Sequence, residues 1–160
     1  MKHTPKSAID RPGPLVMARG AAGAVPMQKE DAMLVRDVMH RGVVTCPMDM
    51  TLREAARRMA RAHCSAMVVL DAAGEVAGII SCEDIARAFV EDRLDIRAEE
   101  IMKTDVVTIV PDIPIKTAVQ LMLDHGVQQL VILHARPSVA RPVGMISLED
   151  VIRCIAGGEA

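Results

Sequence analysis

Hydrophobic residues recur at helical spacing in two separate stretches of this chain. In residues 52–60 and again in residues 115–123 they fall at positions i, i+3, i+4, i+7 and i+8. This spacing predicts two amphipathic helices. A short apolar run follows each helix, at residues 67–70 and 130–133, and predicts a buried strand.

Each predicted buried strand leads into a turn, a second strand and a closing helix. In the first copy the second strand covers residues 76–80 and the helix about 82–92; in the second copy the helix covers about 148–156. The copies are offset by 63 residues before the turn and by 66 after it, because the second turn is longer. A single unit of about 60 residues would leave apolar surface exposed, so the repeat predicts two packed units related by a pseudo-twofold axis.

The stretch that closes the second strand occurs twice. Residues 78–84 read Gly-Ile-Ile-Ser-Cys-Glu-Asp, and residues 144–150 read Gly-Met-Ile-Ser-Leu-Glu-Asp. The aspartate can accept hydrogen bonds from both hydroxyls of a ribose diol, and a serine at a helix start suits a phosphate or another anion. Ser-x-x-Asp also has the spacing of a helix capping box, although Glu or Gln is the usual fourth residue, so both interpretations stay open.

Composition and charge narrow the classes of function. Hydrophobic residues make up 51% of the 160, but Phe89 is the only aromatic residue, so aliphatic side chains and 12 methionines must fill the core. The net charge is −2, and the basic excess lies in residues 1–30, which leaves the rest of the chain acidic. With no aromatic platform and an acidic chain after residue 30, we do not expect nucleic-acid binding, and we interpret the arginines that share one helix face, Arg53, Arg57, Arg58 and Arg61, as a solvated surface.

Several further features of the sequence argue against particular kinds of site. The four cysteines are far apart and form no Cys-x-x-Cys pair, so we expect neither a zinc site nor a disulfide framework, and we predict a cytoplasmic protein. No apolar run approaches the roughly 20 residues of a membrane helix.

Residues 1–30 contain four of the nine prolines and no periodicity, which predicts a disordered Pro/Gly/Ala-rich arm. No catalytic motif is visible, so we do not expect an enzyme.

The in-register repeat, closed each time by Gly-h-h-Ser-x-x-Asp (h, hydrophobic), resembles the CBS domain family, and in particular stand-alone CBS proteins of the bacterial type. The likeness covers residues 33 to about 156. It implies an α+β fold in which two pseudo-twofold-related β-α-β-β-α repeats, a tandem pair called a Bateman module, pack through their sheets. The implied boundaries are the arm at 1–30, the first repeat at 31–92 and the second at 93–157.

The resemblance also implies a function. CBS pairs act as regulatory modules that bind adenosine-containing effectors such as AMP, ATP or S-adenosylmethionine between the repeats, with no required cofactor and no metal. It further implies a homodimer formed through the helices and a separate effector protein. The alternative is a structural dimerisation module that binds no nucleotide.

By resemblance, each of two clefts combines the Ser and Asp of one repeat with the first strands of the other. One cleft would contain Met145, Ser147, Asp150, Val44, Thr45, Ala55, Cys64, Ser65 and Ala66. The other would contain Ile79, Ser81, Asp84, Val107, Thr108, Ala118, Val127, Gln128 and Gln129. Family members that bind phosphates often carry Arg where this chain has Glu83 and Glu149, which argues against polyphosphates. Compensating positive charge could come from Lys103, Lys116, His40 or Arg41.

Overall fold

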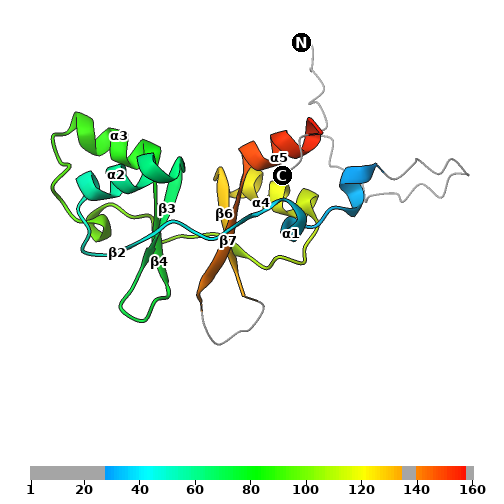
Figure 1. Ribbon diagram of the computed structural model, residues 1–160, viewed down its shortest axis with the longest axis horizontal. Coiled ribbons are helices and arrows are strands. Elements are labelled where there is room, and N and C mark those ends of the chain that lie inside the picture. Colours follow the sequence, from blue (N-terminus) through cyan, green and yellow to red (C-terminus); the bar gives the residue numbers. More distant parts are fainter. Residues whose placement is uncertain (1–27, 135–139, 158–160) are drawn as a thin grey trace, which may run out of the picture.

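The computed structural model describes residues 28–134 and 140–157, which fold into two halves that each contain a sheet and two longer helices (Figure 1). The predicted α+β fold and the order β-α-β-β-α in each repeat are confirmed. The first repeat contains β2 (Thr45–Pro47), α2 (Leu52–Ala62), β3 (Ala66–Leu70), β4 (Val76–Ser81) and α3 (Cys82–Val90). The second contains β5 (Thr108–Ile109), α4 (Ile115–His125), β6 (Gln129–Leu133), β7 (Pro142–Ser147) and α5 (Leu148–Ile155).

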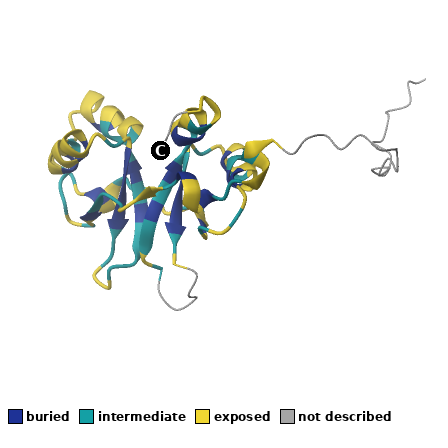
Figure 2. Ribbon diagram, turned by 45° about the vertical axis from the view of Figure 1, so that its right-hand side comes forward, coloured by how far each residue is buried: buried dark blue, intermediate teal, exposed yellow. Residues whose placement is uncertain are grey.

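The two sheets have the same internal topology. In the first, β3 lies between the parallel β2 and the antiparallel β4; in the second, β6 lies between the parallel β5 and the antiparallel β7. The registers also correspond, because Ala66 pairs with Ser81 and Gln129 pairs with Ser147. Buried residues follow the strands, while the outward faces of the helices are exposed (Figure 2).

A segment before each repeat crosses to the other repeat. Before the first repeat, η1 (Lys29–Ala32) and α1 (Val35–Val38) are followed by β1 (His40–Arg41), which pairs antiparallel with β7. Before the second, η2 (Ala98–Glu100) is followed by Lys103, which forms a bridge with Ile79 of β4. The crossing segments also supply core residues, since α1 is buried with the second repeat and Ala98 with the first.

The glycine that opens each Gly-h-h-Ser motif makes room for a crossing segment. A Cβ atom on Gly144 would lie 2.5 Å from the carbonyl oxygen of His40, and one on Gly78 would lie 2.9 Å from that of Lys103. A side chain at either position would collide with backbone. The motif therefore permits close approach of two chain segments as well as leading from a strand into a helix.

Local signals explain where the helices begin and end. Thr51 caps α2 by accepting a hydrogen bond from the backbone N–H of Glu54, whose side chain accepts one in return. The left-handed residue after α4 is Gly126, whereas the equivalent residue after α2 is His63 at φ 50°. Most of the predicted arm, residues 1–27, lies outside the described residues. Among those described, no helix combines the length and the apolar character that crossing a membrane requires.

Candidate functional site

Two adjoining clefts lie between the repeats, one beside each Ser-x-x-Asp motif. We name them the Asp84 cleft, with a volume of about 250 Å³, and the Asp150 cleft, with a volume of about 530 Å³. Each takes its motif from one repeat and its other wall from the opposite repeat. They share several lining residues, including Ser65 and Gln129, so they meet near the centre of the molecule.

Most of the residues expected in each cleft line it. The Asp150 cleft is lined by Val44, Cys64, Ser65, Ala66, Met145, Ser147 and Asp150. The Asp84 cleft is lined by Ile79, Ser81, Asp84, Val107, Val127, Gln128 and Gln129.

Four of the expected residues line neither cleft. Ala55 and Ala118 have no exposed surface, because they lie on the apolar stripes of α2 and α4 and are packed in the core of their own repeats. Thr45 is half-buried in β2, where its carbonyl oxygen accepts a hydrogen bond from Arg58, and Thr108 is exposed on β5. The helix period that predicted α2 and α4 also explains why the two alanines face the core.

Both serine and aspartate pairs form capping boxes. Asp84 Oδ2 accepts hydrogen bonds from the backbone N–H and the hydroxyl of Ser81, at 2.8 and 2.7 Å. Asp150 Oδ2 accepts the corresponding bonds from Ser147, both at 2.8 Å. The capping interpretation is therefore correct for this structure. It uses Oδ2 of each carboxylate, and Oδ1 takes part in other contacts.

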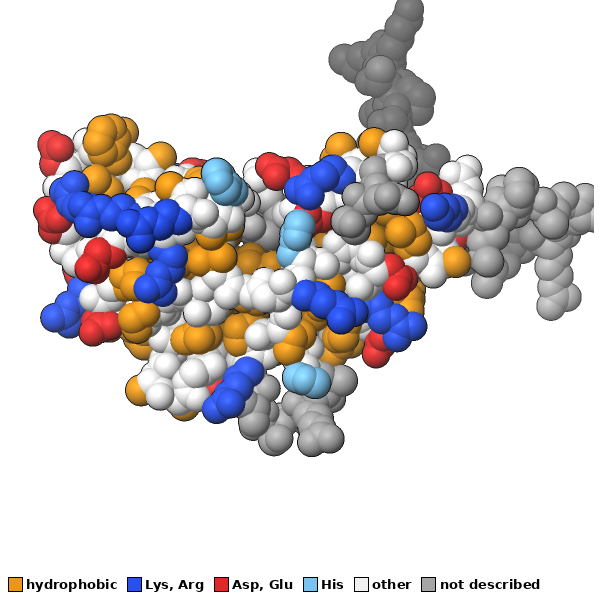
Figure 3. Space-filling model, viewed as in Figure 1, with side chains coloured by type: hydrophobic (Ala, Val, Ile, Leu, Met, Phe, Trp, Pro, Cys, Tyr) orange, Lys and Arg blue, Asp and Glu red, His pale blue; other side chains and the backbone are white. Residues whose placement is uncertain are grey.

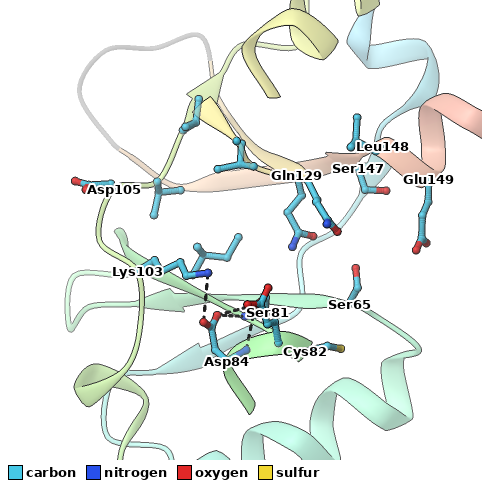
Figure 4. A pocket seen from close by; sticks show the side chains of 17 residues that line it. Ser65, Ser81, Cys82, Asp84, Lys103, Asp105, Gln129, Ser147, Leu148 and Glu149 are labelled. Carbon is cyan, nitrogen blue, oxygen red and sulfur yellow. Dashed lines mark hydrogen bonds and ion pairs between the residues drawn. The ribbon is translucent and has the colours of Figure 1, made fainter. Parts of the chain in front are cut away.

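In each motif, Oδ1 contacts a basic side chain from the crossing segment of the other repeat. Lys103 Nζ lies 3.3 Å from Asp84 Oδ1 (Figure 4), and His40 Nε2 lies 2.6 Å from Asp150 Oδ1. Lys103 and His40 occupy equivalent positions, so the pseudo-twofold axis relates the two contacts. Of the other two candidates for positive charge, Arg41 lines the Asp150 cleft, whereas Lys116 pairs with Asp31 outside both clefts.

The environment of Asp84 keeps it ionised. Partial burial by itself would raise the pKa of this carboxyl, but the hydrogen bonds from Ser81 and the positive charge of Lys103 outweigh it, so the pKa lies below its ordinary value. An ionised carboxylate accepts hydrogen bonds only, which suits a ligand that presents hydroxyl donors.

The two clefts differ in charge. Four carboxylates and one ammonium group line the Asp84 cleft: Glu83, Asp84, Asp105, Glu149 and Lys103. Two carboxylates, two guanidinium groups and two imidazoles line the Asp150 cleft: Glu149, Asp150, Arg41, Arg153, His40 and His63. In the space-filling view, histidine side chains lie near the boundary between the two halves on one face of the molecule (Figure 3).

Sequence reasoning missed Asp105 and Arg153 as cleft residues. Comparing equivalent positions of the repeats could have flagged Asp105, because Gly42 is its counterpart. Nothing in the sequence distinguishes Arg153 from its counterpart Arg87, although Arg153 contacts Asp150 and Arg87 contacts Glu83. Within the described ranges, no three potential metal-ligating side chains come together.

Comparison with known proteins identifies the fold as that of a CBS domain pair. The family model described as "CBS domain" matches residues 35–91 and 98–157. The chain therefore belongs to the CBS domain family, as the repeated motif indicates.

Relatives and a solved structure agree with this assignment. The chain is 34% identical over 123 residues to protein MJ1232 of Methanocaldococcus jannaschii, covering 77% of this chain and 40% of that protein. It is 28% identical to an L-aspartate semialdehyde sulfurtransferase of the same organism, covering 86% of this chain and 26% of that enzyme. The chain thus spans less than half of these relatives.

The solved structure is the CBS domain pair of protein MJ0100 in complex with 5′-methylthioadenosine and S-adenosyl-L-methionine. It superposes with a TM-score of 0.72 at 26% identity, covering 78% of this chain and 97% of that one. Further relatives include a bacterial arabinose 5-phosphate isomerase from Pseudomonas aeruginosa, 32% identical over 125 residues. Because archaeal and bacterial proteins both match, the expected bacterial type is not established.

Proposed function

We propose that this chain is a regulatory module that binds an adenosine-containing ligand between its two CBS repeats. The observation that carries the proposal is the pair of aspartates whose Oδ1 atoms lie beside the clefts at equivalent positions. The similar CBS pair of protein MJ0100 was solved with two adenosine compounds, which supports the same ligand class.

In the proposed complex, Asp84 or Asp150 accepts hydrogen bonds from the ribose hydroxyls through Oδ1, while Oδ2 continues to cap its helix. The purine lies against apolar side chains of the cleft, such as Val44 and Met145 in the Asp150 cleft. Small residues at Ser65 and Ala66 leave room for the ring.

Binding at Oδ1 provides a route for signalling. The ribose hydroxyls compete with Lys103 or His40, which belong to the segments that cross between repeats. Displacing either side chain therefore changes a contact that holds one repeat to the other. We propose that a partner protein detects the resulting shift, and that the module itself catalyses no reaction.

A thermal-shift experiment tests this function. The panel should contain adenosine, AMP, ATP, S-adenosylmethionine and, as a control, guanosine. A ligand at about 100 times its dissociation constant adds about 2.7 kcal/mol of apparent stability. Stabilisation by at least one adenosine compound and not by guanosine supports the proposal. No shift with any compound, in protein freed of copurified nucleotide, would contradict it.

A structural dimerisation role is the second candidate, and the helices favour it. Phe89 and Val90 at the end of α3 are 66% and 81% exposed, and Ile152 and Ile155 of α5 are 64% and 62% exposed. Exposed apolar residues of this size are typical of a protein interface. We propose that two copies associate through these helices whether or not a ligand binds.

Sedimentation analysis separates the two roles. We expect a dimer in the absence of ligand and a shift toward monomer in Phe89→Glu, with Arg61→Glu on α2 as the exposed control. A wild-type monomer at all concentrations would contradict the dimerisation role and leave ligand binding intact.

A further inference from the structure

We propose that the two clefts sort their ligands by charge. In this proposal the Asp150 cleft favours adenosine compounds that carry a 5′-phosphate, whereas the Asp84 cleft favours adenosine compounds without one. The inference rests on the proposed function, since it assigns a ligand class to each cleft of the same site.

Cleft size provides the first support. Ser65 and Gln129 line both clefts, whereas Ala66 lines only the Asp150 cleft and Gln128 lines only the Asp84 cleft. The longer Gln128 side chain takes up more space in its cleft than Ala66 does in the other. This difference agrees with volumes of about 530 and 250 Å³, so the Asp150 cleft has more room for a phosphate beside the nucleoside.

Charge at the end of each crossing segment provides the second support. Arg41 lines the Asp150 cleft and forms no ion pair with any residue in the described part of the chain. The residue after it is Gly42, whose counterpart in the Asp84 cleft is Asp105. A phosphate in the Asp150 cleft therefore meets an unengaged guanidinium group, whereas one in the Asp84 cleft meets an additional carboxylate.

The arginine in each closing helix provides the third support. Arg153 lies 3.2 Å from Asp150 Oδ1 and lines the cleft, while its counterpart Arg87 lies 2.8 Å from Glu83 and does not. When ribose hydroxyls bind Asp150 Oδ1, they release Arg153 and His40 beside the bound nucleotide. Both groups are then available to a 5′-phosphate. In the Asp84 cleft the same exchange releases only Lys103.

Site-resolved NMR tests the sorting, because each cleft has its own methyl probe. Ile79 lines only the Asp84 cleft and Met145 lines only the Asp150 cleft. Protein labelled with ¹³C at Ile and Met methyl groups should be titrated with adenosine and with AMP. We expect adenosine to shift both signals. AMP should shift Met145 at a concentration about tenfold lower than Ile79, as one charge-assisted contact predicts.

Substitutions in the clefts sharpen the test. Arg41→Ala should weaken AMP binding at Met145 by about tenfold and leave adenosine binding unchanged, whereas Arg61→Ala, which alters an exposed arginine outside the clefts, should change neither. The double substitution Thr104→Arg with Asp105→Gly, which copies Arg41 and Gly42, should bring AMP to the Ile79 probe. The reverse exchange is unsuitable, because Gly42 has φ +85°.

The outcomes distinguish the two proposals. If adenosine shifts both methyl signals but AMP shows no preference for Met145, the charge sorting is wrong and the ligand-binding function stands. If neither compound shifts either signal, both proposals fail. A preference for Met145 that Arg41→Ala leaves unchanged would also overturn the sorting.

Discussion

The two repeats carry glycine, serine and aspartate at the same three places in their closing motif, and the structure uses each residue in the same way. Gly78 and Gly144 admit a crossing segment, and each serine and aspartate pair caps a helix. The residues that line the clefts differ instead in size and charge. The repeats therefore share the scaffold that builds two sites but not the chemistry of those sites.

The largest expected effect concerns the glycines that the repeats share. Gly144→Ala should destabilise the protein by about 3 kcal/mol, and Gly78→Ala by about 1–2 kcal/mol. The added methyl group of the first meets the carbonyl oxygen of His40 at 2.5 Å. At Gly78 the nearest atoms, at 2.8 Å, belong to the flexible side chain of Met102, and the carbonyl oxygen of Lys103 is less close, at 2.9 Å. Urea denaturation measures both. Equal losses, or no loss at Gly144, would contradict the close approach described here.

The caps should behave alike in the two repeats. Ser81→Ala and Ser147→Ala should each lower the free energy of unfolding by about 1 kcal/mol, because each removes a hydroxyl that accepts a hydrogen bond from a helix N–H. The same denaturation experiment measures this, with Ser65→Ala as a control that caps no helix. A loss in only one repeat would mean that the two capping boxes are not equivalent.

Acid should weaken the first repeat through Asp84. The pKa of this carboxyl is lowered in the folded protein, so its contribution to stability is present above the unfolded-state pKa and is lost as the pH falls through the folded-state value. Wild-type stability should therefore fall below about pH 4. The stability of Asp84→Asn should fall less steeply over that pH range, whereas the stability of Asp124→Asn should follow that of the wild type. Identical curves for Asp84→Asn and the wild type would exclude the effect.

The smallest effect concerns thiol reactivity. Cys82 is exposed at the rim of both clefts, whereas Cys46 is 2% exposed and burial raises its pKa to about 11. Iodoacetamide at neutral pH should modify Cys82 and leave Cys46 unmodified until the protein unfolds. Adenosine should slow the reaction at Cys82 if it occupies the clefts. Mass spectrometry of tryptic peptides measures both rates, and early labelling of Cys46 would contradict its burial.

Much of the fold could be predicted because the sequence signals that carry it are local. The helical period of residues 52–60, the apolar runs and the doubled closing motif predicted the elements and their order. The crossing of each preceding segment to the other repeat could not be predicted, because β1 contains only two residues and pairs with β7 more than 100 residues away. For the same reason, His40 and Lys103 could be named as cations but not matched to an aspartate.

For the candidate site too, some features could be predicted from the sequence and others could not. The motif predicted Ser81, Asp84, Ser147 and Asp150, and all four line a cleft. Ala55 was expected there because small residues leave room for a purine, yet its place on the helix stripe turns it toward the core. To decide whether Ala55 lines a cleft or packs in the core, one must know which way the apolar stripe of α2 faces. That direction depends on tertiary packing.

Isothermal titration calorimetry with adenosine tests the central claim most directly, by comparing the wild type with a variant that carries both Asp84→Asn and Asp150→Asn. We expect adenosine to bind the wild type and the control Asp124→Asn, and to bind the double variant at least about tenfold more weakly, because each substitution removes a charged acceptor for the ribose hydroxyls. Equal affinity in all three proteins, or no binding to the wild type, would contradict it.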